Sequence, residues 1–252
     1  MKYLQSFVFV YLIFITIVFA QSNNTASVRL ETGIHSAYVW NGADLNHDDP
    51  VLTQALSIHF NKILKNISLS FWTSYGLNKD SVAGDDQSFT LDEFDTLLGY
   101  FIAWNQKISS YIELGWFYWT SNFFSNVGSN KHDFELASYH HLQLSPLSKI
   151  SLVYKRGLDQ GIEGNVFETV YTIQKKLSER INIEPAVKMT ASSQYLDQLI
   201  FSQLALILPI NYLLKPWFIS LSGQYLWVPN YKKLFQDNQH DFVWNLKLGY
   251  QF

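Results

Sequence analysis

Ionisable side chains recur at every second position along several stretches of this chain. Most have apolar or aromatic neighbours, so in an extended strand they point away from those neighbours. Both signs of charge are present on this face, which carries Arg29, Glu31, His35, His59, Glu113, Glu135, His141, Lys155, Glu168, Glu184, Lys188 and Lys247. Such a face could line a polar channel and select solutes by charge. It could equally form ion pairs that fill a narrow interior.

A serine and a histidine share the opposite, apolar face of one stretch. Ser138 and His140 are two residues apart, and a Ser–His pair can act as nucleophile and base when a third group orients the histidine. The sequence offers no such group, so we interpret the pair as chance polar residues and expect no enzyme activity. A lipid-modifying enzyme is the minor alternative. His140 and His141 point to opposite faces of a strand and do not form a metal pair.

One acidic stretch has the spacing that opens a calcium loop. It reads Asp44-Leu45-Asn46-His47-Asp48, but Asp49 stands where glycine is needed and Ala55 where the final glutamate belongs. We expect an acidic surface loop and no metal site, with a loose divalent contact to lipopolysaccharide phosphates as the alternative. The chain has no cysteine, which excludes disulfides and thiolate chemistry. No cofactor is expected, and the net charge of −3 gives no argument for nucleic acid.

The elements that position these charges are extended strands. In the final stretch, Asp241–Phe252, large apolar residues occupy every even position from Phe242 onward. A soluble edge strand of this kind would promote aggregation, whereas a closed barrel in a bilayer gives it a lipid face, a lumen face and no edge.

The same alternation predicts twelve strands. They cover 28–40, 51–60, 67–77, 91–104, 108–118, 134–144, 150–158, 167–173, 181–189, 195–208, 217–227 and 241–252. The stretch 195–208 is almost wholly apolar, so its facing stays open. Short links (62–65, 105–107, 145–148, 177–180 and 209–215) alternate with a second set of links, four of which are clearly longer (41–50, 78–90, 121–131, 159–164, 190–194 and 228–239). This parity is typical of outer-membrane barrels.

Aromatic residues support the same fold. Tyr38, Trp40, Tyr75, Trp116, Tyr118, Tyr225 and Trp227 lie near the long links, and Phe60, Trp104, Trp217, Tyr250 and Phe252 near the short ones. Two such girdles mark the two membrane interfaces. We therefore predict an all-β fold, a 12-stranded antiparallel transmembrane barrel in the bacterial outer membrane.

The N-terminus predicts export. Residues 1–20 combine Lys2, an apolar run and small residues before Gln21, which is typical of a signal peptide cleaved after Ala20. We expect residues 21–27 to form a short periplasmic tail and residues 28–252 to form the barrel. The final strand, which ends in Phe252, is similar to the signature that outer-membrane proteins present to the barrel-assembly machinery.

The first hairpin resembles a known family. His35-Ser36-Ala37-Tyr38-Val39-Trp40-Asn41-Gly42, followed by Asp49-Pro50-Val51-Leu52-Thr53-Gln54, is similar to the opening of the TorF family of porin-like proteins. Asn41 replaces the arginine of that pattern. The resemblance covers about thirty residues and implies an outer-membrane barrel with no catalytic residues and no established substrate.

We therefore expect a channel for passive diffusion of small polar solutes, embedded in outer-membrane lipid and lipopolysaccharide. The residues most expected to tune it are Glu31, His35, His59, Glu113 and Lys188. A non-conducting structural or adhesive barrel, acting through its extracellular loops, is the alternative.

Overall fold

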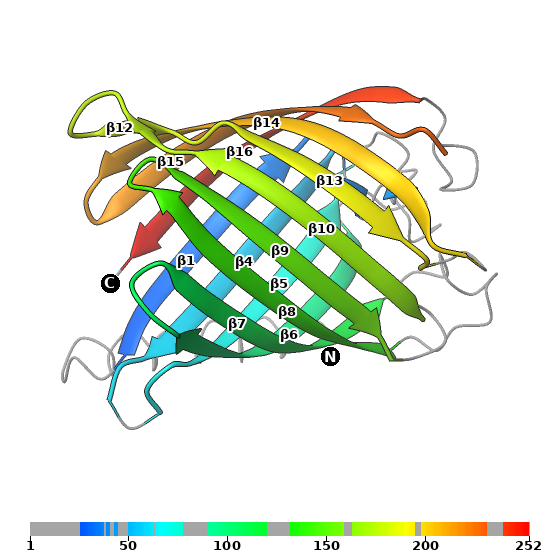
Figure 1. Ribbon diagram of the computed structural model, residues 1–252, viewed down its shortest axis with the longest axis horizontal. Helices are drawn as coiled ribbons and strands as arrows, with labels where there is room; N and C mark the ends of the chain where they lie inside the picture. Colours follow the sequence, from blue (N-terminus) through cyan, green and yellow to red (C-terminus); the bar gives the residue numbers. More distant parts are fainter. Residues whose placement is uncertain are drawn as a thin grey trace.

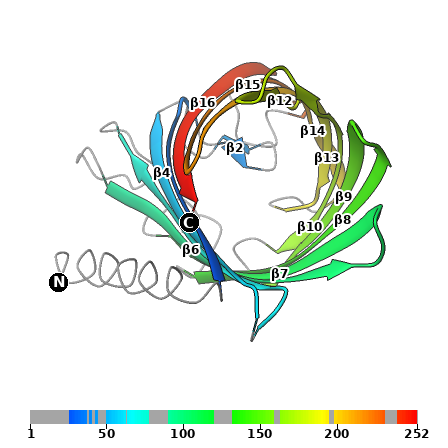
Figure 2. The same cartoon turned by 90° about the vertical axis from the view of Figure 1, so that its left-hand side faces the viewer.

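Twelve antiparallel strands close into a barrel in the computed structural model (Figures 1 and 2). The structure describes residues 26–37, 39–40, 43–44, 50–62, 64–77, 90–119, 132–158, 163–194, 198–230 and 239–251. The predicted signal peptide, most of the acidic stretch after Asp44, and Phe252 lie outside these residues. Within the described residues, no helix is long and apolar enough to cross a membrane.

The strands alternate large apolar and polar residues, as extended segments with two different faces require. Those of the barrel are β1 (Ala26–His35), β4 (Val51–Phe60), β5 (Ile67–Gly76), β6 (Thr90–Ala103), β7 (Ile108–Trp119), β8 (His132–Ser145), β9 (Ser148–Gly157), β10 (Gly164–Ile173), β11 (Lys175–Lys176), β12 (Ile181–Ile183), β13 (Ala186–Ser192), β14 (Ile200–Leu214), β15 (Trp217–Trp227) and β16 (His240–Gln251). A separate hairpin joins β2 (Val39–Trp40) to β3 (Ala43–Asp44).

Each barrel strand pairs with its neighbours in the chain, and β16 pairs with β1 to close the ring. The short strands β12 and β13 both pair with β14 and together form one barrel strand. Strand β11 continues β10 and pairs with β12. The predicted number of strands, twelve, is therefore confirmed, and the paired backbone leaves no open edge among the described strands. The predicted end of the first strand at Trp40 was wrong, because β1 ends at His35 and Val39–Trp40 pair with Ala43–Asp44 instead.

Two prolines explain the main difference from the predicted boundaries. Strand β14 continues through Pro209 to Leu214, although we expected it to end at Leu208 and the link to cover 209–215. The carbonyl of Pro209 accepts a hydrogen bond from Glu184 N at 3.2 Å. Its ring nitrogen, which has no hydrogen, faces the interruption at Glu184 and Pro185 between β12 and β13. The hydrogen bond that Pro209 cannot donate therefore falls where the partner strand is already interrupted, so the proline is tolerated within β14.

The connections separate by length between the two ends of the barrel. At one end, the short-turn end, links of two to six residues join β4 to β5, β6 to β7, β8 to β9, β11 to β12 and β14 to β15. At the other end, the long-loop end, links of six to fifteen residues separate β1 from β4, β5 from β6, β7 from β8, β9 from β10, β13 from β14 and β15 from β16. Strand β1 begins and β16 ends at the short-turn end. This is the arrangement in which tight turns face the periplasm and longer loops face outward.

The outer face of the barrel is apolar and exposed. Leu98 and Leu206 each leave 51% of their surface exposed, and many other large apolar side chains on the same face are similarly open. A soluble protein would bury such a surface. The register also settles the stretch whose facing the sequence left open: Leu206 and Leu208 point outward, and Ala205 points inward.

The first connection folds into the barrel instead of extending away from it. Ser36 still hydrogen-bonds Trp244 of β16, but Ala37, which is 5% exposed, packs against three inner-face residues, Ala205, Leu226 and Val243. The end-on view places β2 within the ring of strands (Figure 2). The inner space is therefore narrowed on the side of β14, β15 and β16.

Candidate functional site: the charged lumen

The pairing register places the predicted charged residues on the inner face. Arg29, Glu31 and His35 lie on β1, His59 on β4, Glu113 on β7, Glu135 and His141 on β8, Lys155 on β9, Glu168 on β10, Lys188 on β13 and Lys247 on β16. Glu184 follows β12 and accepts a hydrogen bond from the Asn182 amide at 3.2 Å. They do not gather in one place, because they are distributed around the whole circumference.

Carboxylates concentrate on three adjacent strands, and we name this part of the inner face the acidic wall. It comprises Glu93 and Asp95 of β6, Glu113 of β7, and Asp133 and Glu135 of β8. Asp133 is 0% exposed and Glu93 is 1% exposed. In the ring order the acidic wall stands across from β14–β16, the strands that hold the first connection.

Sequence reasoning missed three members of the acidic wall. Asp133 was not predicted as a lumen residue because the predicted strand began at residue 134, whereas β8 begins two residues earlier, at His132. Glu93 and Asp95 lie within a predicted strand and alternate with the outward-facing Phe94. Their odd positions in this alternation could have predicted that they face the lumen, because odd-numbered residues of this strand lie on the face opposite Phe94.

Hydrogen bonds hold two members of the acidic wall in place. The Tyr139 hydroxyl donates to Glu113 Oε1 at 3.3 Å, and the Gln194 amide donates to Glu135 Oε2 at 3.2 Å. Asp95 and Glu93 lie close enough for their carboxyl groups to interact electrostatically. The hydrogen bonds from Tyr139 and Gln194 fix Glu113 and Glu135 against the wall, so these two carboxylates act on the lumen from defined positions.

Two lysines border the acidic wall. Lys155 interacts electrostatically with Glu113, Glu135 and Glu168. Lys188 Nζ lies 3.5 Å from Glu168 Oε1. The charged residues of the inner face are therefore all acidic on β6 and of both signs from β9 to β13. This difference makes the electrostatic potential unequal on the two sides of the lumen.

The predicted residues of β1 have structural partners of their own. Arg29 forms an ion pair with Glu31, and its guanidinium lies 4.5 Å from the centre of the Phe218 ring. His35 Nε2 is 3.1 Å from Thr53 Oγ1. Glu31 and His35, on which we expected solute selection to depend, therefore lie apart from the acidic wall.

The outward-facing histidine pairs with a different serine from the one considered above. His140 Nδ1 is 2.9 Å from Ser110 Oγ, and Trp104 Nε1 donates to the same oxygen at 2.8 Å. Ser110 is 2% exposed. Among the described residues no carboxylate hydrogen-bonds His140, and in the same part of the chain no group of three or more acidic or histidine side chains could hold a metal. We interpret the Trp104–Ser110–His140 contact as part of the aromatic girdle at the short-turn end.

Comparisons with known proteins support the fold. No family model matches the chain, and no curated protein matches it. Among solved structures it is similar to the KdgM porin (TM-score 0.57, 10% identity, 90% of this chain and 99% of that chain) and to the COG4313 outer membrane channel from Pseudomonas putida F1 (TM-score 0.55, 12% identity, 90% and 96%). It is also similar to the NanC porin (TM-score 0.53, 8% identity, 88% and 98%). The chain has the fold of outer-membrane channel barrels.

Proposed function

We propose that this protein is an outer-membrane channel through which small polar solutes diffuse passively. The observation that carries the proposal is the lumen itself, in which the acidic wall stands across from the strands that hold the inward-folded first connection. A narrow polar path with fixed charges on one side selects solutes by size and charge. The exposed apolar belt and the likeness to solved outer-membrane channels support this location and this role.

The organisation of the whole chain follows from this proposal. Residues 1–20 direct export and are removed after Ala20. The periplasmic tail is two residues shorter than we expected from the sequence, because Ala26 and Ser27 already pair with β4, so the tail covers residues 21–25 and the barrel begins at Ala26. The last strand, ending in Phe252, engages the barrel-assembly machinery, and the outer belt contacts lipid and lipopolysaccharide. The TorF resemblance over the first hairpin supports membership of a porin-like family.

The acidic wall favours cations over anions in this channel. Carboxylates on low-dielectric walls focus a negative potential into the lumen and raise the local concentration of cations. The KdgM porin has been described in complex with oligogalacturonate, which is a polyanion. The acidic wall argues for a different solute preference in this chain.

The decisive test is single-channel recording of the refolded mature chain in planar bilayers beside a Glu113→Gln variant. We expect discrete conductance steps, a preference for K⁺ over Cl⁻ and a smaller preference in the variant, because one lumen charge is lost. A chain that folds and inserts but never conducts would contradict the channel.

One observation favours the alternative of a non-conducting structural or adhesive barrel. Several inner-face carboxylates, Asp133 and Glu93 among them, are almost completely covered, as side chains are in barrels whose interior is filled. A silent but inserted barrel would support this alternative and direct attention to the extracellular loops. A lipid-modifying enzyme stays the minor alternative, because His140 and Ser110 have no acidic partner among the described contacts.

A further inference from the structure

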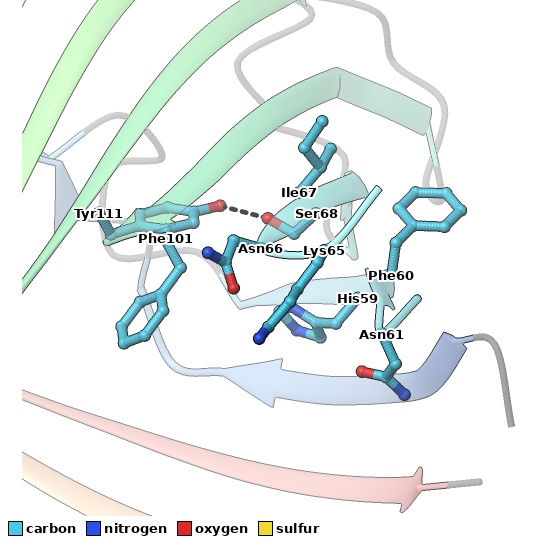
Figure 3. A pocket seen from close by; sticks show the side chains of 9 residues that line it. All are labelled: His59, Phe60, Asn61, Lys65, Asn66, Ile67, Ser68, Phe101 and Tyr111. Carbon is cyan, nitrogen blue, oxygen red and sulfur yellow. Dashed lines mark hydrogen bonds between the residues drawn. The ribbon is translucent and has the colours of Figure 1, made fainter. Parts of the chain in front are cut away.

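A small pocket opens at the short-turn end of the barrel, away from the inward-folded hairpin. Its volume is about 300 Å³, at the lower end of the range for small-molecule sites. Figure 3 shows His59, Lys65, Asn66 and Phe101 bordering one shared space, with Asn61 at its edge. The pocket therefore collects polar side chains from a turn and an aromatic side chain from a neighbouring strand.

The pocket is held in shape by the backbone around it. Asn66 has a φ of 76°, a left-handed conformation that asparagine tolerates better than most residues. Its carbonyl accepts a hydrogen bond from Phe101 N at 2.8 Å, which ties the turn to β6. Ser68 Oγ and the Tyr111 hydroxyl, 2.9 Å apart, border the pocket next to Asn66 (Figure 3). The pocket is therefore formed before any ligand arrives.

The charge of the pocket is positive. Lys65 supplies an ammonium group and His59 an imidazole, and no carboxylate belongs to the lining. The member of the acidic wall nearest along β7 is Glu113, which interacts with Tyr111 but does not line the pocket. Exposed basic residues also occupy the other turns around the short-turn end of the barrel, and we name them the basic rim: Lys62, Lys107, Lys175, Lys176, Arg180 and Lys215, with Glu179 as the acid among the described turn residues there. This rim draws anions toward the pocket.

The remaining lining residues favour a ligand that contains a ring of about the size of a sugar. The Phe101 side chain faces the lumen and leaves 42% of its surface exposed, so a flat apolar face is free to pack against a ligand. The amides of Asn61 and Asn66 offer both donors and acceptors, which suits hydroxyl groups. A lysine, two amides and one aromatic face together match a sugar ring that carries an anionic group.

We propose that this pocket binds a small solute in which a phosphate or carboxylate group is attached to a sugar-sized ring. Lys65 and His59 contact the anionic group, the two asparagines contact the hydroxyl groups, and Phe101 packs against the ring. This site is separate from the acidic wall, and its occupancy does not depend on whether the barrel conducts.

The test is isothermal titration calorimetry on the full mature chain, refolded in a zwitterionic detergent. The probes are glucose 6-phosphate, glucose and inorganic phosphate. We expect glucose 6-phosphate to bind most tightly, and Lys65→Gln to weaken it about tenfold, because a charge-assisted hydrogen bond is lost. The matched control is Lys107→Gln, which removes the same charge from another turn of the same rim and should change the affinity less than about twofold.

A second variant separates the ring from the charge. Phe101→Leu should weaken binding of glucose 6-phosphate but leave inorganic phosphate unchanged. Equal losses in Lys65→Gln and Lys107→Gln, or no binding of any probe, would overturn the proposal. To distinguish a lipid headgroup as the source of the anion, the titration is repeated with phosphatidylglycerol added to the detergent. If that lipid displaces glucose 6-phosphate at low stoichiometry, the headgroup and not a dissolved solute is the occupant.

Discussion

At the residue scale, glycines on the inner face make room for aromatic rings that lie against the wall. A Cβ atom added to Gly99 would lie 1.9 Å from the Tyr111 hydroxyl oxygen, and one added to Gly249 would lie 2.0 Å from the Phe218 ring. Tyr111 in turn contacts Ser68 and stands 5.7 Å from the Tyr139 ring. The acidic wall and the pocket are therefore joined by one aromatic cluster whose packing depends on a missing side chain.

Gly99→Ala should destabilise the barrel by about 1–3 kcal/mol, because the new methyl group displaces the Tyr111 ring. Urea unfolding of the refolded protein, followed by tryptophan fluorescence, measures this loss. In a Tyr111→Ala background the same substitution should cost less than about 0.5 kcal/mol, since the obstructing ring is gone. An equal cost in both backgrounds would show that strand propensity, and not the ring, explains the glycine.

Lys155→Gln should raise the preference of the channel for cations, opposite in sign to Glu113→Gln. Lys155 is the positive charge that acts on Glu113, Glu135 and Glu168 together, so its removal leaves their negative potential uncompensated. The reversal potential in a KCl gradient measures the change. A shift of the same sign in both variants would mean that selectivity is set elsewhere in the lumen.

At the element scale, the first connection is the feature that shapes the path through the barrel. Strand β1 ends at His35, and the chain then turns inward so that Ala37 packs on Leu226, Val243 and Ala205. This apolar contact fixes the hairpin to one wall. The opening left for solutes then lies between the hairpin and the acidic wall.

Ala37→Asp should release the hairpin, because it buries a charge among apolar side chains. We expect single-channel conductance to rise, by roughly twofold or more, as the constriction is removed. Gln198→Glu, which adds the same charge to an exposed residue at the same end, should leave conductance unchanged. A wild-type conductance in Ala37→Asp would mean that the hairpin does not limit flow.

Much of the strand pattern could be predicted from the sequence, because period-two alternation is a local property. Strands β4 and β15 have the bounds predicted for them, Val51–Phe60 and Trp217–Trp227. The predicted end of β14 was wrong. A proline such as Pro209 breaks a strand only where the neighbouring strand needs a hydrogen bond from its missing N–H, and the sequence of β14 alone does not show where the neighbouring strand is interrupted. The inward turn at Ala37 and the gathering of acids from β6 to β8 depend on register and on long-range packing, which alternation does not encode.

At the scale of the whole molecule, the two charge zones lie at different depths of one path. The basic rim occupies the short-turn end, and the acidic wall runs along β6, β7 and β8 with Glu93 close to the long-loop end. A solute that crosses the barrel meets opposite potentials in sequence. The direction of travel therefore matters for any charged solute.

The conductance should consequently differ between positive and negative voltage. We expect a clear asymmetry at 0.1 M KCl, where charges act over about 10 Å, and its loss at 1 M, where the range is about 3 Å. Lys→Gln substitution of Lys62, Lys107 and Lys215 together should reduce the asymmetry without closing the channel. A linear current–voltage relation at low salt would show that the two zones do not act on the path.

The closing pair of strands also determines how the barrel can form. Ser36 and Trp244, which hydrogen-bond across the junction of β1 and β16, are 208 positions apart in the chain. The neighbouring hairpins can assemble locally, but the ring gains its last row of backbone hydrogen bonds only after almost the whole chain has been ordered. Such a high contact order makes folding slow. A chain cut before β16 keeps two unsatisfied strand edges, so the intermediate that precedes closure is the form most exposed to aggregation and most in need of assistance.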